Sequence, residues 1–211
     1  MRLAKLLLVV AALMLATACH DPASDKSHAL TTEATQASPQ PTHTAGAQKY
    51  SITSDNSKIE FTGSQVVGTH NGSFQKFSGE VDYTGNPETS RVNVTIDPAS
   101  LQADDPKLTA HLKTPDFFDV AKYPEAKFVS TTIKAGGEKG ASHTVTGNLT
   151  MHGVTKSVTF PATIAATAEG INVDSTFTIN RRDFAINYAG PANNLVRDNV
   201  VLTLKIYATK R

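Results

Sequence analysis

Apolar side chains recur at every second position along much of the chain after residue 50. Ile59 and Phe61 alternate with Lys58 and Glu60, for example, and the same alternation returns several times further on. A repeat of two is typical of a β-strand that turns one face to a core and the other to water. Such series run over residues 59–63, 77–83, 92–96, 145–151, 158–164, 171–179 and 200–206. The pattern predicts an all-β domain.

Turn-forming residues separate these series and indicate how the strands connect. They are Asn71-Gly72, Gly85-Asn86-Pro87, Gly136-Gly137, His152-Gly153 and Glu169-Gly170, and His152-Gly153 predicts a tight hairpin. The other face of the strands carries Thr, Ser, Lys, Asp and Asn, which indicates an antiparallel sheet with one solvated side. We therefore expect about eight antiparallel strands that close into a barrel, because closure hides the sheet edges.

One segment, residues 97–124, breaks the alternation. Pro98 suits the first turn of a helix, where its missing N–H costs nothing, and Leu108 and Leu112 stand at helical spacing. Asp116 would serve as the N-cap of a second short helix. The segment predicts one or two short helices across the barrel mouth.

The N-terminus has the three parts of a secretory signal peptide, which we assign to residues 1–18. Arg2 and Lys5 form a basic start, residues 6–15 are apolar, and residues 16–18 are small. The apolar run is shorter than the roughly 20 residues that span a bilayer.

Cys19 follows directly and is the only cysteine, so no internal disulfide can form. The site resembles the lipobox of bacterial lipoproteins, in which this cysteine takes a diacylglyceryl group and anchors the protein to a membrane. Ala16 stands where such proteins usually have Leu, and Ala16-Thr17-Ala18 also suits ordinary signal peptidase. We favour lipidation; ordinary cleavage would leave a soluble periplasmic protein. His20 in place of an Asp retention signal favours the periplasmic face of the outer membrane.

Residues 19–49 predict a lipidated cysteine followed by a disordered linker. The stretch is rich in Ala, Thr, Ser, Pro and Gln, with Leu30 as its one large aliphatic residue. It offers too little apolar surface to offset the entropy of ordering. As a flexible coil it would reach about 30 Å. Residues 50–211 then form one barrel domain.

Charge and motifs exclude several function classes. Removing residues 1–18 leaves 18 basic and 19 acidic residues, a formal charge of −1, which gives no electrostatic footprint for nucleic acid. His, Cys and acidic residues form no cluster at metal-ligand spacing, so we expect no metal and no cofactor beyond a bound lipid. Nucleophile-elbow, phosphate-loop and dinucleotide motifs are absent from the sequence. We expect no enzymatic activity; a hydrolase would need a serine or an acid within reach of His111.

Four stretches together resemble one family: residues 111–119 (HLKTPDFFD), 122–128 (KYPEAKF), 145–156 (VTGNLTMHGVTK) and 180–184 (NRRDF). They resemble the YceI-like family of periplasmic polyisoprenoid-binding proteins over about residues 50–211. The resemblance implies a lipocalin-like antiparallel β-barrel with an elongated apolar tunnel for a polyprenyl or quinone-like lipid. An eight-stranded barrel is wide enough to hold one slender ligand. The family often has a glycine after Arg182-Asp183-Phe184, where this chain has Ala185.

The candidate ligand-binding residues are inward-facing apolar side chains and two polar groups near the mouth. They are Phe61, Tyr83, Phe117, Phe118, Phe160, Phe177 and Leu204, with His111 and Arg182 as donors to a headgroup. The apolar set could equally fill a solid core, and His111 could simply tie the lid to the barrel. Gly63, Gly79, Gly147, Ala162 and Ser175 are small inward residues and favour empty space.

Two functions follow from this sequence. The first is an envelope lipoprotein that binds or carries a long isoprenoid lipid in its barrel. The second is an envelope stress or interaction protein with a solid barrel and no lipid ligand, and phenylalanines in mutual contact without a continuous void would favour it. The oligomeric state, monomer or homodimer, stays open.

Overall fold

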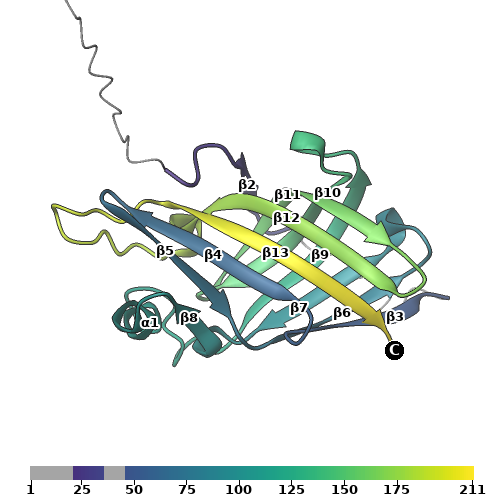
Figure 1. Ribbon diagram of the computed structural model, residues 1–211, viewed down its shortest axis with the longest axis horizontal. Helices are drawn as coiled ribbons and strands as arrows, with labels where there is room; N and C mark the ends of the chain where they lie inside the picture. Colours follow the sequence, from purple (N-terminus) through teal and green to yellow (C-terminus); the bar gives the residue numbers. More distant parts are fainter. Residues whose placement is uncertain (1–20, 36–45) are drawn as a thin grey trace, which may run out of the picture.

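The computed structural model describes residues 21–35 and 46–211, which wrap into a β-barrel (Figure 1). Each strand of the ring is antiparallel to its neighbours, and the last strand returns to the first. In ring order the eight strands are β3 (Gln48–Thr53), β6 (Phe77–Tyr83), β7 (Arg91–Ile96), β9 (Ala126–Ala135), β10 (His143–Met151), β11 (Val154–Ala166), β12 (Gly170–Asn180) and β13 (Asn199–Lys210). The predicted eight-stranded antiparallel barrel is confirmed.

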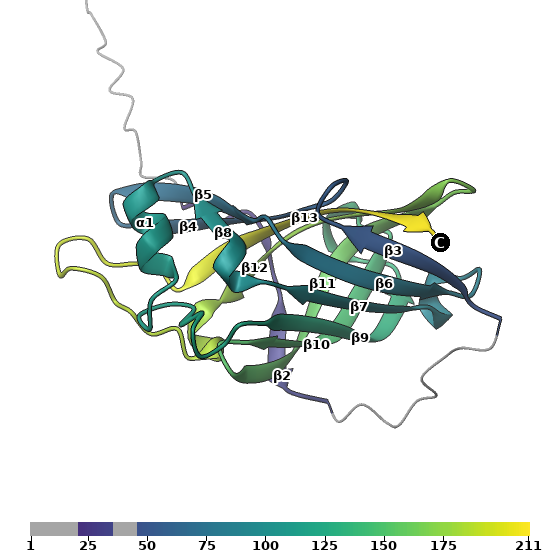
Figure 2. The ribbon, with the colours of Figure 1, turned by 90° about the horizontal axis from the view of Figure 1, so that it is seen from below.

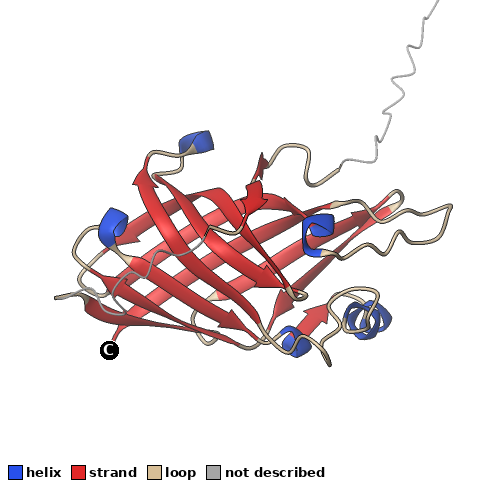
Figure 3. Ribbon diagram, turned by 180° about the vertical axis from the view of Figure 1, so that it is seen from behind, coloured by secondary structure: helices blue, strands red, loops and turns tan. Residues whose placement is uncertain are grey.

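Local turn chemistry sets the register of the hairpins. His152 and Gly153 adopt φ of 50° and 75° and join β10 to β11 with Met151 opposite Val154. Positive φ at both turn residues matches the twist of the flanking strands, so the predicted tight hairpin is confirmed. Figure 3 shows the wall from behind, with the helical turns at the ends of strands.

Three strands extend the ring at one end. The strand β13 pairs with β3 near its C-terminus and with β4 (Lys58–Gln65) through residues 201–205. Beyond β4 lie β5 (Gly68–Phe74) and β8 (Leu101–Ala103). The β4–β5 hairpin, the helix α1 (Pro106–Leu112) and the loop 185–198 gather at this end, opposite the C-terminus (Figures 1 and 2). We call this end the mouth.

The turn predicted at Asn71-Gly72 is wrong, because both residues lie inside β5. Gly72 stands opposite Phe61 of β4, and a Cβ on Gly72 would collide with the Phe61 ring. Because Gly72 has no side chain, the Phe61 ring can pack directly against the backbone of β5.

The prediction of one or two short helices at the mouth is confirmed, with one α-helix in the described residues. This helix is α1, with Pro106 in its first turn and Asp105 accepting from the Leu108 N–H at 2.8 Å. Pro98 opens a 3₁₀ turn, η2 (Pro98–Ser100), capped by Asp97. The other 3₁₀ turns are η1 (Pro87–Thr89), η3 (Glu138–Gly140) and η4 (Arg181–Phe184).

The second helix predicted at Asp116 is wrong, and so is the role of Asp116 as its N-cap. The chain after α1 folds into successive turns, with the Asp119 N–H donating back to the Thr114 carbonyl at 2.9 Å. The Asp116 carboxylate instead pairs with the His111 imidazole.

Residues 21–35 lie along the barrel wall, so the prediction of a disordered linker is wrong for this stretch. β11 and β12 pair only through residues 163–166 and 171–174. Where they diverge toward the mouth, β2 (Leu30–Glu33) pairs with β11 and β1 (Ser27–His28) pairs in parallel with β12 (Figure 1). The segment is too polar to fold in isolation, but the diverging strands β11 and β12 offer it unpaired backbone groups.

The predicted signal peptide, residues 1–18, and Cys19 lie outside the described residues, as does part of the predicted linker. None of the helices in the described ranges has both the length and the apolar character needed to cross a membrane.

Candidate functional site

A cavity of about 470 Å³ runs through the barrel and is partly open to solvent. This volume falls in the range of small-molecule sites. Every strand of the ring contributes lining residues, among them Ile52, Val81, Val92, Ile133, Val145, Val158, Ile171 and Leu204. The lining also includes Pro87 from a turn at the far end and His111 at the mouth. The barrel therefore encloses a continuous apolar space and is not a solid core.

The seven residues proposed from the sequence as a ligand-binding set all line this cavity: Phe61, Tyr83, Phe117, Phe118, Phe160, Phe177 and Leu204. Phe160 and Phe177 stack with ring centroids 4.3 Å apart and an interplanar angle of 8°. At the mouth, Phe61 contacts Phe74, whose ring meets Phe118 edge-on at 5.8 Å. The aromatic side chains thus form separate groups along the cavity.

The small inward residues contribute less space than the sequence argument expected. Of the five, only Gly63 lines the cavity, and a Cβ at that position would meet nothing within 4 Å. The space above Gly147 is filled by the Phe128 ring. The Ser175 hydroxyl donates to the Pro161 carbonyl. The cavity owes its volume to the width of the ring rather than to glycines.

The lid segment contributes a second aromatic group around His111. The imidazole lies edge-on to Phe117 at 5.0 Å and to Tyr188 at 4.9 Å, and these two rings are 5.2 Å apart. Leu112 and Phe117 are buried, whereas the His111 side chain stays about one-third exposed. His111 therefore both lines the cavity and faces solvent.

His111 Nε2 lies 2.8 Å from Asp116 Oδ2, so the acid that a hydrolase would need is within reach. A base oriented by a carboxylate still requires a nucleophile at its other side. In the described part of the chain the imidazole contacts an acid and two aromatic rings, and no serine or threonine hydroxyl is among these partners. The geometry provides an oriented imidazole at a cavity mouth.

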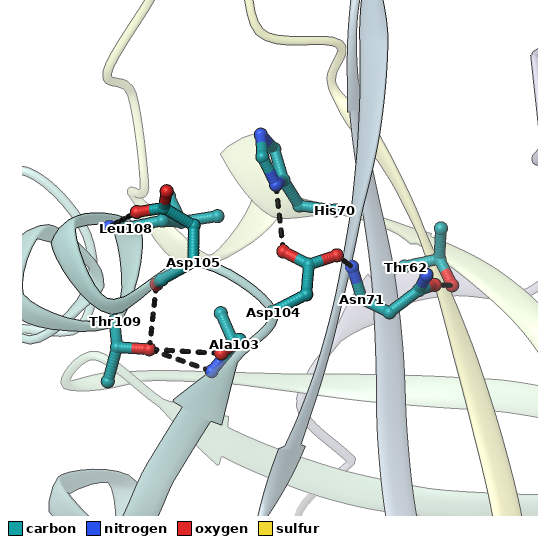
Figure 4. A network of polar contacts seen from close by, with 8 residues as sticks. All are labelled: Thr62, His70, Asn71, Ala103, Asp104, Asp105, Leu108 and Thr109. Carbon is teal, nitrogen blue, oxygen red and sulfur yellow. Dashed lines mark hydrogen bonds and ion pairs between the residues drawn. The ribbon is translucent and has the colours of Figure 1, made fainter.

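Asp104 joins β5 to the segment before α1 (Figure 4). Its carboxylate lies 2.8 Å from His70 Nδ1 and accepts the Asn71 N–H at 2.7 Å. These two bonds, the backbone one first, hold the pKa of Asp104 below its ordinary value. His70, which also lines the cavity, is thereby fixed in place.

Arg181 is the one charged side chain among the described residues that is buried at the mouth. It donates to the carbonyls of Ile186, Val196 and Arg197 at 2.6, 3.2 and 3.1 Å, and to Asp198 Oδ1 at 3.0 Å. Burial lowers the pKa of the guanidinium from its ordinary value, although Asp198 opposes this effect. Arg181 thus ties both ends of the loop 185–198 to the barrel.

Arg182, the donor proposed from the sequence, does not line the cavity. Its side chain is half exposed and pairs with Asp198 at 2.7 Å. Asp198 pairs with both Arg181 and Arg182. The sequence does not show which of two adjacent arginines is buried. The turn η4 directs Arg181 into the barrel and leaves Arg182 exposed. His152, interpreted as structural, donates from Nδ1 to the Phe184 carbonyl at 3.1 Å.

Ser64 is a residue that sequence reasoning missed. Its hydroxyl is buried, lines the cavity and has no hydrogen-bond partner in the described residues. Gln65, His70, His111 and Arg197 line the same end. Most polar lining residues of the cavity therefore lie at the mouth. At the far end the hydroxyls of Tyr83 and Ser90 also line it, but they donate to the Gly85 and Asn86 carbonyls at 3.0 and 2.7 Å. A grouping of three or more His, Cys, Asp or Glu side chains suited to a metal is not found within residues 21–35 and 46–211.

Two solved structures of other proteins have a similar fold. BcnA of Burkholderia cenocepacia is 29% identical and aligns with a TM-score of 0.66 over 75% of this chain and 99% of its own. A polyisoprenoid binding domain from Saccharophagus degradans has a TM-score of 0.62 over 78% of this chain and 99% of its own; at 16% identity it shows the fold alone.

The sequence itself is also similar to known families. A UPF0312 protein of Pseudomonas putida strain GB-1 is 44% identical over 126 residues, which are 56% of this chain and 65% of that protein. The match thus spans just under two thirds of the relative. The model of the YceI-like domain matches residues 50–208. The chain belongs to the YceI-like family.

Proposed function

We propose that this protein binds a long isoprenoid lipid, polyprenyl or quinone-like, inside its barrel and holds or carries it in the cell envelope. The observation that carries the proposal is one apolar cavity bordered by all eight ring strands, with most of its polar lining residues, and the unpartnered Ser64 hydroxyl, at one end. A long hydrocarbon chain with a single polar head group matches this arrangement, because its apolar body would fill the cavity and its polar head would lie at the mouth. The Saccharophagus degradans domain is a polyisoprenoid binding domain, which supports the same class of ligand.

The mouth would receive the polar head of the lipid. A hydroxyl or quinone oxygen there could pair with Ser64, whose buried hydroxyl has no partner among the described residues. His111, held by Asp116 through Nε2 and open to solvent, offers Nδ1 as a second polar partner. Leaving a buried hydroxyl unpaired costs about 1–3 kcal/mol, so a ligand that satisfies it gains affinity.

The cellular setting is part of the proposal. We infer from the sequence that residues 1–18 are a signal peptide and that Cys19 carries the lipid anchor, facing the periplasm from the outer membrane. Binding rather than catalysis fits the contacts of His111, which include no hydroxyl nucleophile among the described residues. The second candidate, a barrel that acts only as an interaction scaffold, requires a filled interior and is disfavoured by the cavity.

The test is a titration with isoprenols of increasing chain length. β12 and β13 pair over residues 170–180, about 37 Å of strand. Affinity should therefore rise with chain length and level off once the chain exceeds the barrel. Gly63→Phe, which fills open space at the mouth, should weaken binding at least tenfold, roughly 1.4 kcal/mol. Gly63→Ala is the matched control and should bind normally. Equal affinity in both variants, or no dependence on length, would contradict the proposal.

A further inference from the structure

Exposed apolar side chains gather at the mouth. Four large hydrophobic residues are exposed in the described part of the chain, and three of them belong to the mouth: Val66, Val67 and Leu195, exposed by 46, 70 and 48%. The fourth, Leu30, lies in β2 on the side wall. We call Val66, Val67 and Leu195 the apolar tip.

The apolar tip is held together by hydrogen bonds between two distant segments. The Val66 N–H donates to the Leu195 carbonyl at 3.2 Å, and the Val67 N–H donates to Asn194 Oδ1 at 3.3 Å. The Asn194 amide also donates to Gln65 Oε1 at 2.6 Å. The β4–β5 hairpin and the loop before β13 therefore present their apolar side chains as one unit, at the same end of the barrel in both views (Figures 1 and 2).

The apolar tip borders the cavity. Gln65 and Val196, each adjacent in sequence to a tip residue, line the cavity. Arg197, the next residue, also lines it and donates its backbone N–H to the Ser64 carbonyl at 2.8 Å. A surface that covers the tip would therefore lie next to the place where an apolar ligand enters.

The N-terminal segment begins at the same place. Arg197 Nη1 lies 3.2 Å from Asp21 Oδ2, which ties the start of the described N-terminal stretch to the mouth. Cys19 precedes Asp21 by two residues, a contour of about 7 Å. An acyl chain on Cys19 would start beside the apolar tip, a consequence that rests on the proposed lipidation.

We propose that the apolar tip inserts into the surface of a lipid bilayer, so that the cavity mouth faces the membrane and an isoprenoid passes between them without crossing water. Burial of apolar surface drives such contact. Charges near the apolar tip are paired with each other in Arg197–Asp21 and Arg182–Asp198. We therefore expect apolar contact to contribute more to binding than attraction to anionic lipid.

The experiment measures binding of the full chain, in Cys19→Ala form so that no acyl chain contributes, to vesicles of phosphatidylethanolamine and phosphatidylglycerol. Val67→Asp and, separately, Leu195→Asp should each lower the bound fraction at least about tenfold, since both place a charge in the bilayer. Leu30→Asp, an equally exposed position on the side wall, is the matched control and should bind as the parent does.

Ligand binding is measured separately, with an isoprenol supplied from cyclodextrin. Val67→Asp should bind the isoprenol normally from cyclodextrin and take it up slowly from vesicles. If no variant binds the isoprenol but the tip still controls vesicle binding, the proposed function fails and the docking proposal stands. Equal vesicle binding by the parent, Val67→Asp and Leu30→Asp would overturn the docking proposal. So would a dimer that forms without vesicles and dissociates in Val67→Asp, because the tip would then be a self-association surface.

Discussion

The wall of the barrel and its mouth are stabilised by different kinds of contact. In the wall, apolar side chains of consecutive strands face one cavity, and turns such as His152-Gly153 set the register locally. At the mouth, polar side chains join separate segments of the chain: Asp104 holds His70 and Arg181 holds the loop 185–198. In a binding protein the wall encloses the space for the ligand, and the opening carries the groups that recognise it. Because the wall and the mouth depend on different contacts, substitutions in one should leave the other largely unchanged.

The largest expected effect is at Arg181. Replacing Arg181 with Ala leaves the Ile186, Val196 and Arg197 carbonyls of the mouth loop without this donor. Each buried polar group left unpaired costs about 1–3 kcal/mol, so we expect a loss of about 3 kcal/mol. Chemical denaturation should show this loss of unfolding free energy. Arg182→Ala removes an exposed arginine that pairs with the same Asp198, and should cost less than about 1 kcal/mol. Similar losses in the two variants would contradict the assignment of Arg181 as the residue that holds the mouth loop.

Substitution of Gly147 tests how tightly side chains pack in the barrel wall. A Cβ on Gly147 would collide with the Phe128 ring and stand 2.6 Å from the Val129 carbonyl oxygen, so Gly147→Ala should cost about 1–3 kcal/mol. Gly63→Ala enters open space and should change stability by less than about 0.5 kcal/mol. Thermal unfolding of both variants checks the difference; equal losses would mean that the two glycines have the same role.

The N-terminal segment lies between the two regions, since it completes the wall near the mouth. The Ala29 N–H donates to the Thr178 carbonyl at 2.8 Å, and Thr178 is buried. Ala29→Pro should therefore cost about 1–2 kcal/mol and raise hydrogen exchange in β11 and β12 near the mouth. Ala34→Pro, just beyond β2, is the control. Unchanged exchange in Ala29→Pro would show that the segment adds nothing to the wall.

The smallest expected effect is the pH response of Asp104. Because its pKa in the folded protein lies below the ordinary value, its contribution is fully present above about pH 4 and is lost as the pH falls through the lowered value. The site is exposed, so the contribution should stay under about 1 kcal/mol. Asp104→Asn should remove the response, seen as loss of acid-dependent exchange in β5. A response that persists in Asp104→Asn would assign it to another group.

The wall was predictable from the sequence and the mouth was not. A period of two assigns Phe160 and Phe177 to one face of their strands without knowledge of any partner. Glycines are ambiguous: Gly153 forms a turn, whereas Gly72 lies in a strand beneath Phe61. At the mouth, the partner decides the role. Asp116 resembles a helix cap until His111 is seen beside it, and Arg181 differs from Arg182 only through the carbonyls that surround it. Both of these contacts span only five residues, but the turns that bring the partners together leave no repeat in the sequence.

The most direct test of the account is native mass spectrometry of the protein purified from the cell envelope without detergent exchange, followed by lipid extraction. The account predicts one bound isoprenoid per barrel, with polyprenyl or quinone-like mass, and its absence from Gly63→Phe prepared in the same way. Protein that is consistently empty and does not take up added isoprenoid would contradict the central claim. A ligand retained equally by Gly63→Phe would show that it binds outside the cavity.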